Sequence, residues 1–233
     1  MQFPKVGLYV LFLSFCTPSV ASQDQVRVFT HGQGDFGTQL EDGQFVGRGI
    51  DLLKCSMQAL GQPFSVNAAA MVRKSRLASS DTMDAWFPSI VHGTDSHIER
   101  IAYPIGTMLI YWYVPIDTKY DVASEAFKAR AKVSAFPGST PEKILRASGF
   151  QLHPGTDDEN SMILRLVEGR IDGFLGTTIE GLLKPRPKAL LGTRIKRTLY
   201  REFEVGIEFM ESFIGRHPNF VRRFQAALTN CTK

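Results

Sequence analysis

Short apolar runs alternate with segments of helical spacing along the first half of this chain. Residues 25–30 alternate between apolar and polar side chains, which is typical of a half-buried strand. Residues 50–60 carry apolar side chains at helical spacing, and Gly61 then ends the predicted helix. Two further strands are expected at residues 64–66 and 83–87, with a helix at 72–78. Pro88 closes the second of these strands.

The second half repeats this alternation around a glycine turn. Residues 132–136 form a short apolar run, and the segment 137–142 then opens a helix. Ser139 is a favourable N-cap, Pro141 suits a first helical turn, and Glu142 stands three residues after Ser139, as in a capping box. A crossover strand is expected at residues 108–114, and a short helix within residues 117–132. A longer helix is expected at residues 158–168 and a strand at 171–175. A return strand at residues 203–209 and a closing helix at 218–229 complete the prediction.

These patterns predict an α/β protein made of two similar lobes. Each half runs strand, helix, strand, helix, strand, an order that implies a parallel sheet with right-handed crossovers. We expect Thr156 or Asp157 to cap the longer helix of the second lobe, and residues 182–197 to form a surface loop. The helix start at residues 138–140 presents free N–H groups and a partial positive charge, which can hold a carboxylate or another anion.

The N-terminus has the pattern of an export signal. Lys5 precedes an uncharged, mostly apolar run at residues 6–15, and the small residues Ser19 and Ala21 fit a signal-peptidase site. The apolar run is too short for a membrane span. Residues 1–21 are therefore predicted to be a cleavable signal peptide, and the mature protein is predicted to be soluble and periplasmic.

Charge and cysteine content narrow the functional classes. The full chain has a formal net charge of +4 with Lys5 included, and its basic clusters are not interleaved with aromatic residues and glycines. Nucleic-acid binding is therefore not expected. An oxidising compartment allows one disulfide bridge between Cys55 and Cys231, and two unpaired thiols are the alternative.

Several stretches, in order along the chain, resemble motifs of one protein family. Residues 47–53 are similar to the Gly-(Phe/Ile)-Asp opening of its first helix, and residues 168–173 to its Gly-Arg-Val-Asp-Ala signature. Residues 138–140 resemble its second-lobe ligand turn, and residues 217–219 the His-Pro-Glu that opens its last helix. The family is that of the bacterial periplasmic solute-binding proteins of type 2, in their amino-acid-binding branch, which have the Venus-flytrap fold.

The resemblance implies mainly parallel sheets in two lobes, with crossover strands as the hinge. On this basis residues 22–114 form the first part of lobe 1, residues 115–198 form lobe 2, and residues 199–233 return to lobe 1 as a strand and the C-terminal helix. Members of the family close on a small solute. The expected function is capture of a small-molecule ligand for an ABC-type permease by a monomeric protein, with a stand-alone receptor for a sensor protein as the alternative.

The sequence departs from the family pattern where an amino-acid ligand would be held. The Thr-x-x-Arg motif, whose arginine clamps the ligand carboxylate, is replaced by Asp95 and Ser96, and Arg100 stands too close to Pro104 to match it. No aspartate follows the second-lobe signature to hold the ligand's ammonium group, because residues 174–178 read Phe-Leu-Gly-Thr-Thr. A standard α-amino acid is therefore not expected, and the predicted solute is a different small organic anion.

The residues expected to contact this solute come from both lobes, and each has a structural alternative. Arg73 can replace the missing clamp, since a guanidinium pairs bidentately with a carboxylate, or it can belong to a solvated helix face. Hydroxyl groups at the helix start can bind the anion or serve only as N-caps. The full set of predicted ligand-binding residues is Phe36, Arg73, Trp86, Ser89, Gly138, Ser139, Thr140 and Thr177. The alternatives are core packing for Trp86 and an exposed loop for Phe36.

Enzymatic activity is not expected from the sequence. The five histidines lie far apart, without metal-ligand spacing, and the sequence has no serine elbow or phosphate-binding loop, so neither a metal nor a cofactor is predicted. One enzyme class with the same fold, the cyclohexadienyl dehydratases, needs an acid–base carboxylate in the cleft. Glu180 is the candidate for that role, with an exposed loop charge as the alternative.

Overall fold

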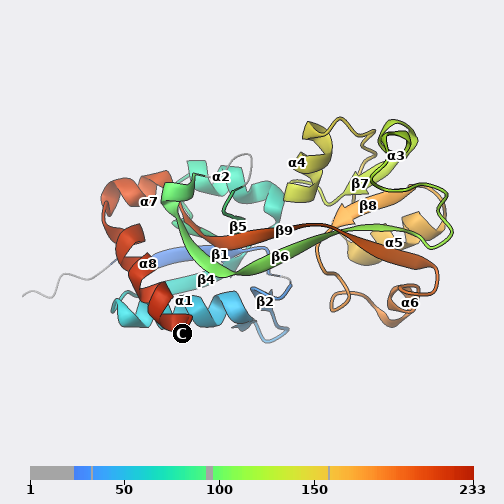
Figure 1. Ribbon diagram of the computed structural model, residues 1–233. Coiled ribbons are helices and arrows are strands. Elements are labelled where there is room, and N and C mark those ends of the chain that lie inside the picture. The colour runs from blue at the N-terminus through green and yellow to red at the C-terminus, as the bar shows by residue number, and fades with distance from the viewer. Residues whose placement is uncertain (1–23, 33, 93–96, 157) are drawn as a thin grey trace, which may run out of the picture.

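The computed structural model describes residues 24–32, 34–92, 97–156 and 158–233 (Figure 1). The predicted signal peptide lies outside these residues. Two lobes of mixed helix and strand lie side by side, joined by the two longest strands, β6 (Ile101–Pro115) and β9 (Ile195–Phe209). None of the helices in the described ranges has the length and apolar composition needed to cross a membrane. The predicted two-lobed α/β fold is confirmed.

Lobe 1 contains the N-terminal part of the chain and the two C-terminal helices. Its strands are β1 (Val26–Thr30), β4 (Phe64–Ala68) and β5 (Ala85–Ile90), with a small hairpin of β2 (Thr38–Gln39) and β3 (Phe45–Val46). Its helices are α1 (Arg48–Ala59), α2 (Lys74–Ser79), α7 (Glu211–Arg216) and α8 (Phe220–Cys231), with 3-10 turns η1 (Met71–Arg73) and η2 (Ile98–Arg100). Helix α1 buries Ile50, Leu53 and Met57, as their helical spacing predicts.

Lobe 2 is smaller and lies at the other end of the two long strands. Its elements are α3 (Glu125–Arg130), β7 (Val133–Ala135), α4 (Thr140–Ala147), α5 (Glu159–Val167), β8 (Gly173–Gly176) and α6 (Pro185–Lys188). The predicted cap of α5 is wrong, because Asp158 is the N-cap and its carboxylate accepts the N–H groups of Asn160 and Ser161. Helix α6 lies within the segment predicted as a loop, with Pro185 in its first turn.

One seven-stranded sheet runs through both lobes in the order β4-β1-β5-β9-β6-β8-β7. The strands that each lobe contributes on its own are parallel, β1 to β4 and β5 in lobe 1 and β7 to β8 in lobe 2. Strands β6 and β9 run antiparallel to each other and to their neighbours. Because β6 passes from lobe 1 into lobe 2 and β9 returns, these two hinge strands connect the lobes.

Strand β5 and the two hinge strands are longer than the sequence predicts. Strand β5 continues past Pro88, which lies at a register shift against β9, so the predicted end of this strand is wrong. Strand β6 begins at Ile101 because a similar shift accommodates Pro104. Strand β9 begins at Ile195, and most of its added part is exposed and polar, so hydrophobicity does not reveal it.

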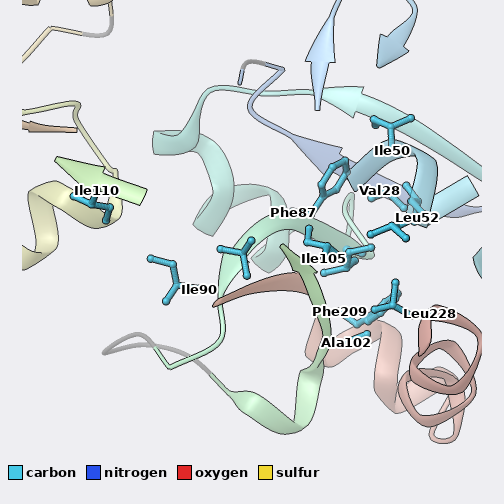
Figure 2. Close-up of a cluster of buried hydrophobic side chains, with 14 of the residues drawn as sticks. Val28, Ile50, Leu52, Phe87, Ile90, Ala102, Ile105, Ile110, Phe209 and Leu228 are labelled. Carbon is cyan, nitrogen blue, oxygen red and sulfur yellow. The ribbon is translucent and has the colours of Figure 1, made fainter. Parts of the chain in front are cut away.

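The core of lobe 1 lies between the sheet and helices α1 and α8. Figure 2 shows apolar side chains from several elements meeting there, among them Val28, Ile50, Phe87, Ile105, Phe209 and Leu228. Helix α8 packs on α1, and a disulfide bridge joins Cys55 of α1 to Cys231 of α8, with their Cα atoms 6.1 Å apart. Of the two states that the sequence leaves open, the structure has the bridged one.

Candidate functional site

A cleft of about 1020 Å³ lies between the two lobes. Lobe 1 lines it with the segment from the end of β4 to the start of α2, with β5 and with Glu208 of β9. Lobe 2 lines it with the N-terminus of α4, the start of α5 and the segment after β8. Most of these segments follow the carboxyl ends of parallel strands, which is where ligands of open α/β sheets usually bind.

Every predicted ligand-binding residue except Phe36 lines this cleft. These residues are Arg73, Trp86 and Ser89 from lobe 1, and Gly138, Ser139, Thr140 and Thr177 from lobe 2. Trp86 has no exposed surface and forms a small apolar cluster with Met83 and Met210, so it packs behind the cleft wall. The structure thus brings the set together from two lobes, and the role of each residue in binding stays a prediction.

Phe36 lies away from the cleft and packs against the core of lobe 1. A Cβ placed on Gly106 of β6 would lie 2.7 Å from Cε1 of the Phe36 ring, so the ring covers this hinge strand. The backbone carbonyl of Phe36 also accepts the N–H of Ile50 at 3.2 Å. Phe36 therefore fixes the start of α1 against the hinge strand.

Lys74 and Glu208 form an ion pair on the lobe 1 wall, and Ser89 hydrogen-bonds to Glu208. The Lys74 Nζ lies 2.7 Å from the Glu208 Oε2, and the Ser89 hydroxyl donates to the same oxygen at 2.7 Å. Burial raises the pKa of Glu208, but the charge of Lys74 and the hydrogen bonds from Lys74 and Ser89 outweigh it and lower the pKa. Glu208 therefore stays charged near neutral pH.

Sequence reasoning did not identify Lys74 and Glu208 as site residues. They are 134 positions apart, on α2 and β9, and they meet only because β9 returns to lobe 1 beside β5. No local pattern signals such a pair. Lys74 stands in the basic cluster next to Arg73, where a solvated face is the simpler interpretation of the sequence.

Arg73 is a cation of the cleft that no acidic residue in the described part of the chain neutralises. It lies in η1 with an exposed side chain, directly before Lys74 in the chain. Among the residues that the structure describes, its guanidinium has no hydrogen bond or ion pair. A guanidinium in a cleft offers several N–H donors to a carboxylate, which makes Arg73 the strongest anion-binding group of this wall.

The lobe 2 wall is formed by the start of α4, where the capping predicted from sequence is present. The Ser139 hydroxyl accepts the N–H of Glu142 at 3.3 Å, and the Glu142 carboxylate accepts the N–H of Gly138 at 2.7 Å. The N–H of Ser139 donates to the carbonyl of Phe136 at 3.1 Å. Most N–H groups of the turn thus have partners inside the protein, so the hydroxyl groups of Ser139 and Thr140 are the better donors to a ligand.

The two walls touch where Gly138 of lobe 2 meets Val72 of lobe 1. A Cβ placed on Gly138 would lie 2.9 Å from Cγ1 of Val72, closer than real Cβ atoms approach. Gly138 also has a φ of +74°, a conformation that L side chains rarely adopt. A glycine at this position therefore allows the lobes to approach each other at the edge of the cleft.

Replacing Gly138 with alanine should weaken ligand binding. The added methyl group holds the lobes apart at Val72, so a ligand cannot contact both walls at once, and we expect the affinity to fall roughly tenfold. Gly149 at the other end of α4 is the matched control, because its φ is also +74° and only the Lys128 Cε lies near it, at 3.9 Å. Calorimetric titration of the two variants measures the difference.

Both variants should lose about 1 kcal/mol of stability, because each forces a side chain into the left-handed region. Only Gly138→Ala should lose affinity. An equal loss of affinity in both variants, or none in Gly138→Ala, would contradict the closure contact.

Glu180 does not line the cleft. Its carboxylate forms an ion pair with Arg197 and accepts the backbone N–H of Ile179 at 3.0 Å. The Arg197 guanidinium in turn stacks 4.7 Å from the centre of the Tyr111 ring. These contacts direct Glu180 toward the hinge strands, which does not fit the acid–base role that the sequence suggests for it.

The charges of the cleft favour a single negative charge on a ligand. Among the described residues, three cationic and two acidic side chains line it, namely Arg73, Lys74, Lys143, Glu159 and Glu208, so these five leave one formal positive charge in excess. Burial lowers the pKa of His31, so this histidine stays neutral near pH 7. Apolar side chains such as Met71, Met108 and Phe136 form much of the remaining surface.

No protein-family model matches the sequence, and no curated protein does either. Many solved structures share the fold. A histidine kinase sensor domain with similarity to periplasmic binding proteins matches with a TM-score of 0.70 at 14% identity, over 89% of this chain and 90% of that one. The ancestral amino acid-binding protein AncCDT-1, a precursor of cyclohexadienyl dehydratase, matches with a TM-score of 0.66 at 16% identity, over 89% of each chain. Holo ArgBP from T. maritima matches with a TM-score of 0.66 at 14% identity, over 90% of each chain.

At identities of 14–16%, the TM-scores of 0.66 to 0.70 establish the fold alone. The chain has the two-lobed, type 2 periplasmic-binding-protein fold, as its motifs implied.

Proposed function

We propose that the protein is a periplasmic solute-binding protein that captures a small organic anion between its lobes and delivers it to an ABC-type permease. The observation that carries this proposal is the guanidinium of Arg73, which has no partner among the described residues and lines the same cleft as the Ser139 and Thr140 hydroxyl groups of the other lobe. An anion held by both walls at once would stabilise the closed arrangement, because each wall supplies part of the binding free energy.

The size and composition of the cleft agree with a small organic ligand. Sites for small molecules are typically about 300–1000 Å³, mostly apolar, with a few polar groups that fix orientation. The volume of about 1020 Å³ lies just above that range. The excess positive charge of the described lining residues then selects against cationic ligands and in favour of a monoanion.

Delivery to a sensor protein is the second candidate, and one comparison favours it. The sensor domain with this fold is matched over 90% of its length with a TM-score of 0.70. A permease gene beside the gene for this protein would favour transport, and a sensor kinase or cyclase gene there would favour sensing.

A dehydratase activity has less support from the cleft. AncCDT-1 is described as a precursor of such an enzyme, but Glu180, the carboxylate that the sequence suggests for acid–base chemistry, is paired with Arg197 outside the cleft. Consumption of prephenate by the purified protein would support the enzyme and count against a pure binding role.

Thermal unfolding of the mature protein tests the binding proposal. A carboxylate at ten times its Kd should raise the free energy of unfolding by about 1.4 kcal/mol. For a chain of this size that corresponds to roughly 3–6 °C in the melting temperature. The neutral amide of the same compound is the matched control and should give a smaller shift, because it carries no charge for Arg73. No response to a wide range of organic anions would contradict the proposal.

A further inference from the structure

The lobe 1 wall holds a carboxylate that the protein itself already neutralises. Glu208 Oε2 receives the Lys74 ammonium group at 2.7 Å and the Ser89 hydroxyl at 2.7 Å. The Lys74 Nζ also lies 3.0 Å from the Ser89 Oγ and 5.8 Å from the centre of the Trp86 ring. Lys74, Ser89 and Glu208 line the cleft in front of Trp86, so a bound solute meets an ion pair on this wall and no bare carboxylate.

This arrangement disfavours a solute that brings its own ammonium group. An ammonium ion taken out of water needs a carboxylate or several acceptors, because an unpaired buried charge is unfavourable. Among the described residues that line the cleft from lobe 1, Glu208 is the sole carboxylate, and it is already paired with Lys74. A zwitterionic solute whose ammonium group faces the lobe 1 wall would therefore bring this group close to two cations, Lys74 and Arg73.

We propose that Lys74 determines the specificity of the cleft, by supplying from the protein the ammonium group that an amino-acid ligand would otherwise bring to Glu208. The solute class that fits is a carboxylate without an amino group. Its carboxylate pairs with Arg73, and its apolar body lies against Met71, Met108 and Phe136. This inference rests on the proposed function and narrows the solute of the same site.

Matched pairs of compounds test the inference. We choose 3-phenylpropanoate with phenylalanine, pentanoate with 2-aminopentanoate, and butanedioate with aspartate, because the members of each pair differ only by the α-amino group. Calorimetric titration of the wild-type protein should show at least roughly tenfold tighter binding of the amine-free member in every pair that binds. Lys74→Met removes the built-in ammonium group and should shift this ratio at least tenfold toward the amino acid.

Two further variants distinguish an effect of the Lys74 charge on ligand specificity from a loss of packing in the cleft wall. Lys74→Arg keeps a cation beside Glu208 and should keep the wild-type preference. The double variant Lys74→Met/Glu208→Gln removes the carboxylate as well, so it should lose the amino-acid binding that Lys74→Met gains. A loss of packing alone would affect both members of a pair equally and would leave the ratio unchanged in all variants.

The outcomes distinguish this inference from the proposed function. Amino acids that bind the wild-type protein as tightly as their amine-free partners would overturn the inference and leave the binding proposal intact. An unchanged ratio in Lys74→Met would overturn the inference as well. If no compound of the three pairs binds either the wild-type protein or Lys74→Met, then both the inference and its premise of a small-carboxylate site fail.

Discussion

Removing the Cys55–Cys231 bridge should lower the free energy of unfolding by about 5 kcal/mol, because the bridge closes a very long loop. The two cysteines are separated by 176 positions, and the bridge ties α1 to α8 across one side of lobe 1. A cross-link of this span restricts the unfolded chain strongly. Cys55 is exposed and Cys231 is half-buried, so serine at both positions adds little cost of its own.

Chemical denaturation of the double variant Cys55→Ser/Cys231→Ser measures this effect, and the reduced wild-type protein serves as a second form without the bridge. The two should agree, with a melting temperature roughly 10–20 °C below that of the oxidised protein. Ligand affinity should be unchanged, because neither cysteine lines the cleft. A double variant within about 1 kcal/mol of the wild type would show that the bridge contributes little.

Replacing Arg73 with alanine should weaken binding of the carboxylate ligand about a hundredfold, or about 2.7 kcal/mol. The guanidinium makes charge-assisted hydrogen bonds to the anion, and closure removes the water that could replace them. In Arg73→Ala the carboxylate of the bound ligand is buried without a counter-charge. The free energy of burying this unpaired charge adds to the loss of the attraction between the ligand and Arg73.

Arg76→Ala is the matched control for Arg73→Ala. Arg76 lies three positions further along, in α2, and is also exposed, but it does not line the cleft. Its loss removes the same charge from the same region of lobe 1 and should change the affinity less than twofold. Equal losses in the two variants would indicate a general effect of charge, and an unaffected Arg73→Ala would remove Arg73 from the site.

The parts of the site that the sequence predicts are those with local signals. The start of α4 is one example, because the cap at Ser139, the proline at position 141 and Glu142 all lie within four residues and act on one another. Gly138 belongs to the same turn. A short window of sequence thus contains the interactions that cap this helix.

The parts that the sequence does not predict depend on contacts between distant segments. Lys74 meets Glu208 only after β9 has returned from lobe 2, and Phe36 turns away from the cleft because Gly106 of β6 leaves room for its ring. The exposed half of β9 lacks the apolar alternation that marks a strand, and its pairing with β6 fixes it instead.

Hydrogen–deuterium exchange of the mature protein, with and without the carboxylate that gives the largest thermal shift, tests the central claim most directly. A ligand held between the lobes should slow amide exchange in residues 68–75 of lobe 1 and residues 136–142 of lobe 2 together, because these segments form opposite walls. Helix α8, on the far side of lobe 1, should gain no protection beyond that which the higher free energy of unfolding gives to the whole protein. Protection confined to one wall, or to a surface outside the cleft, would contradict ligand capture between the lobes.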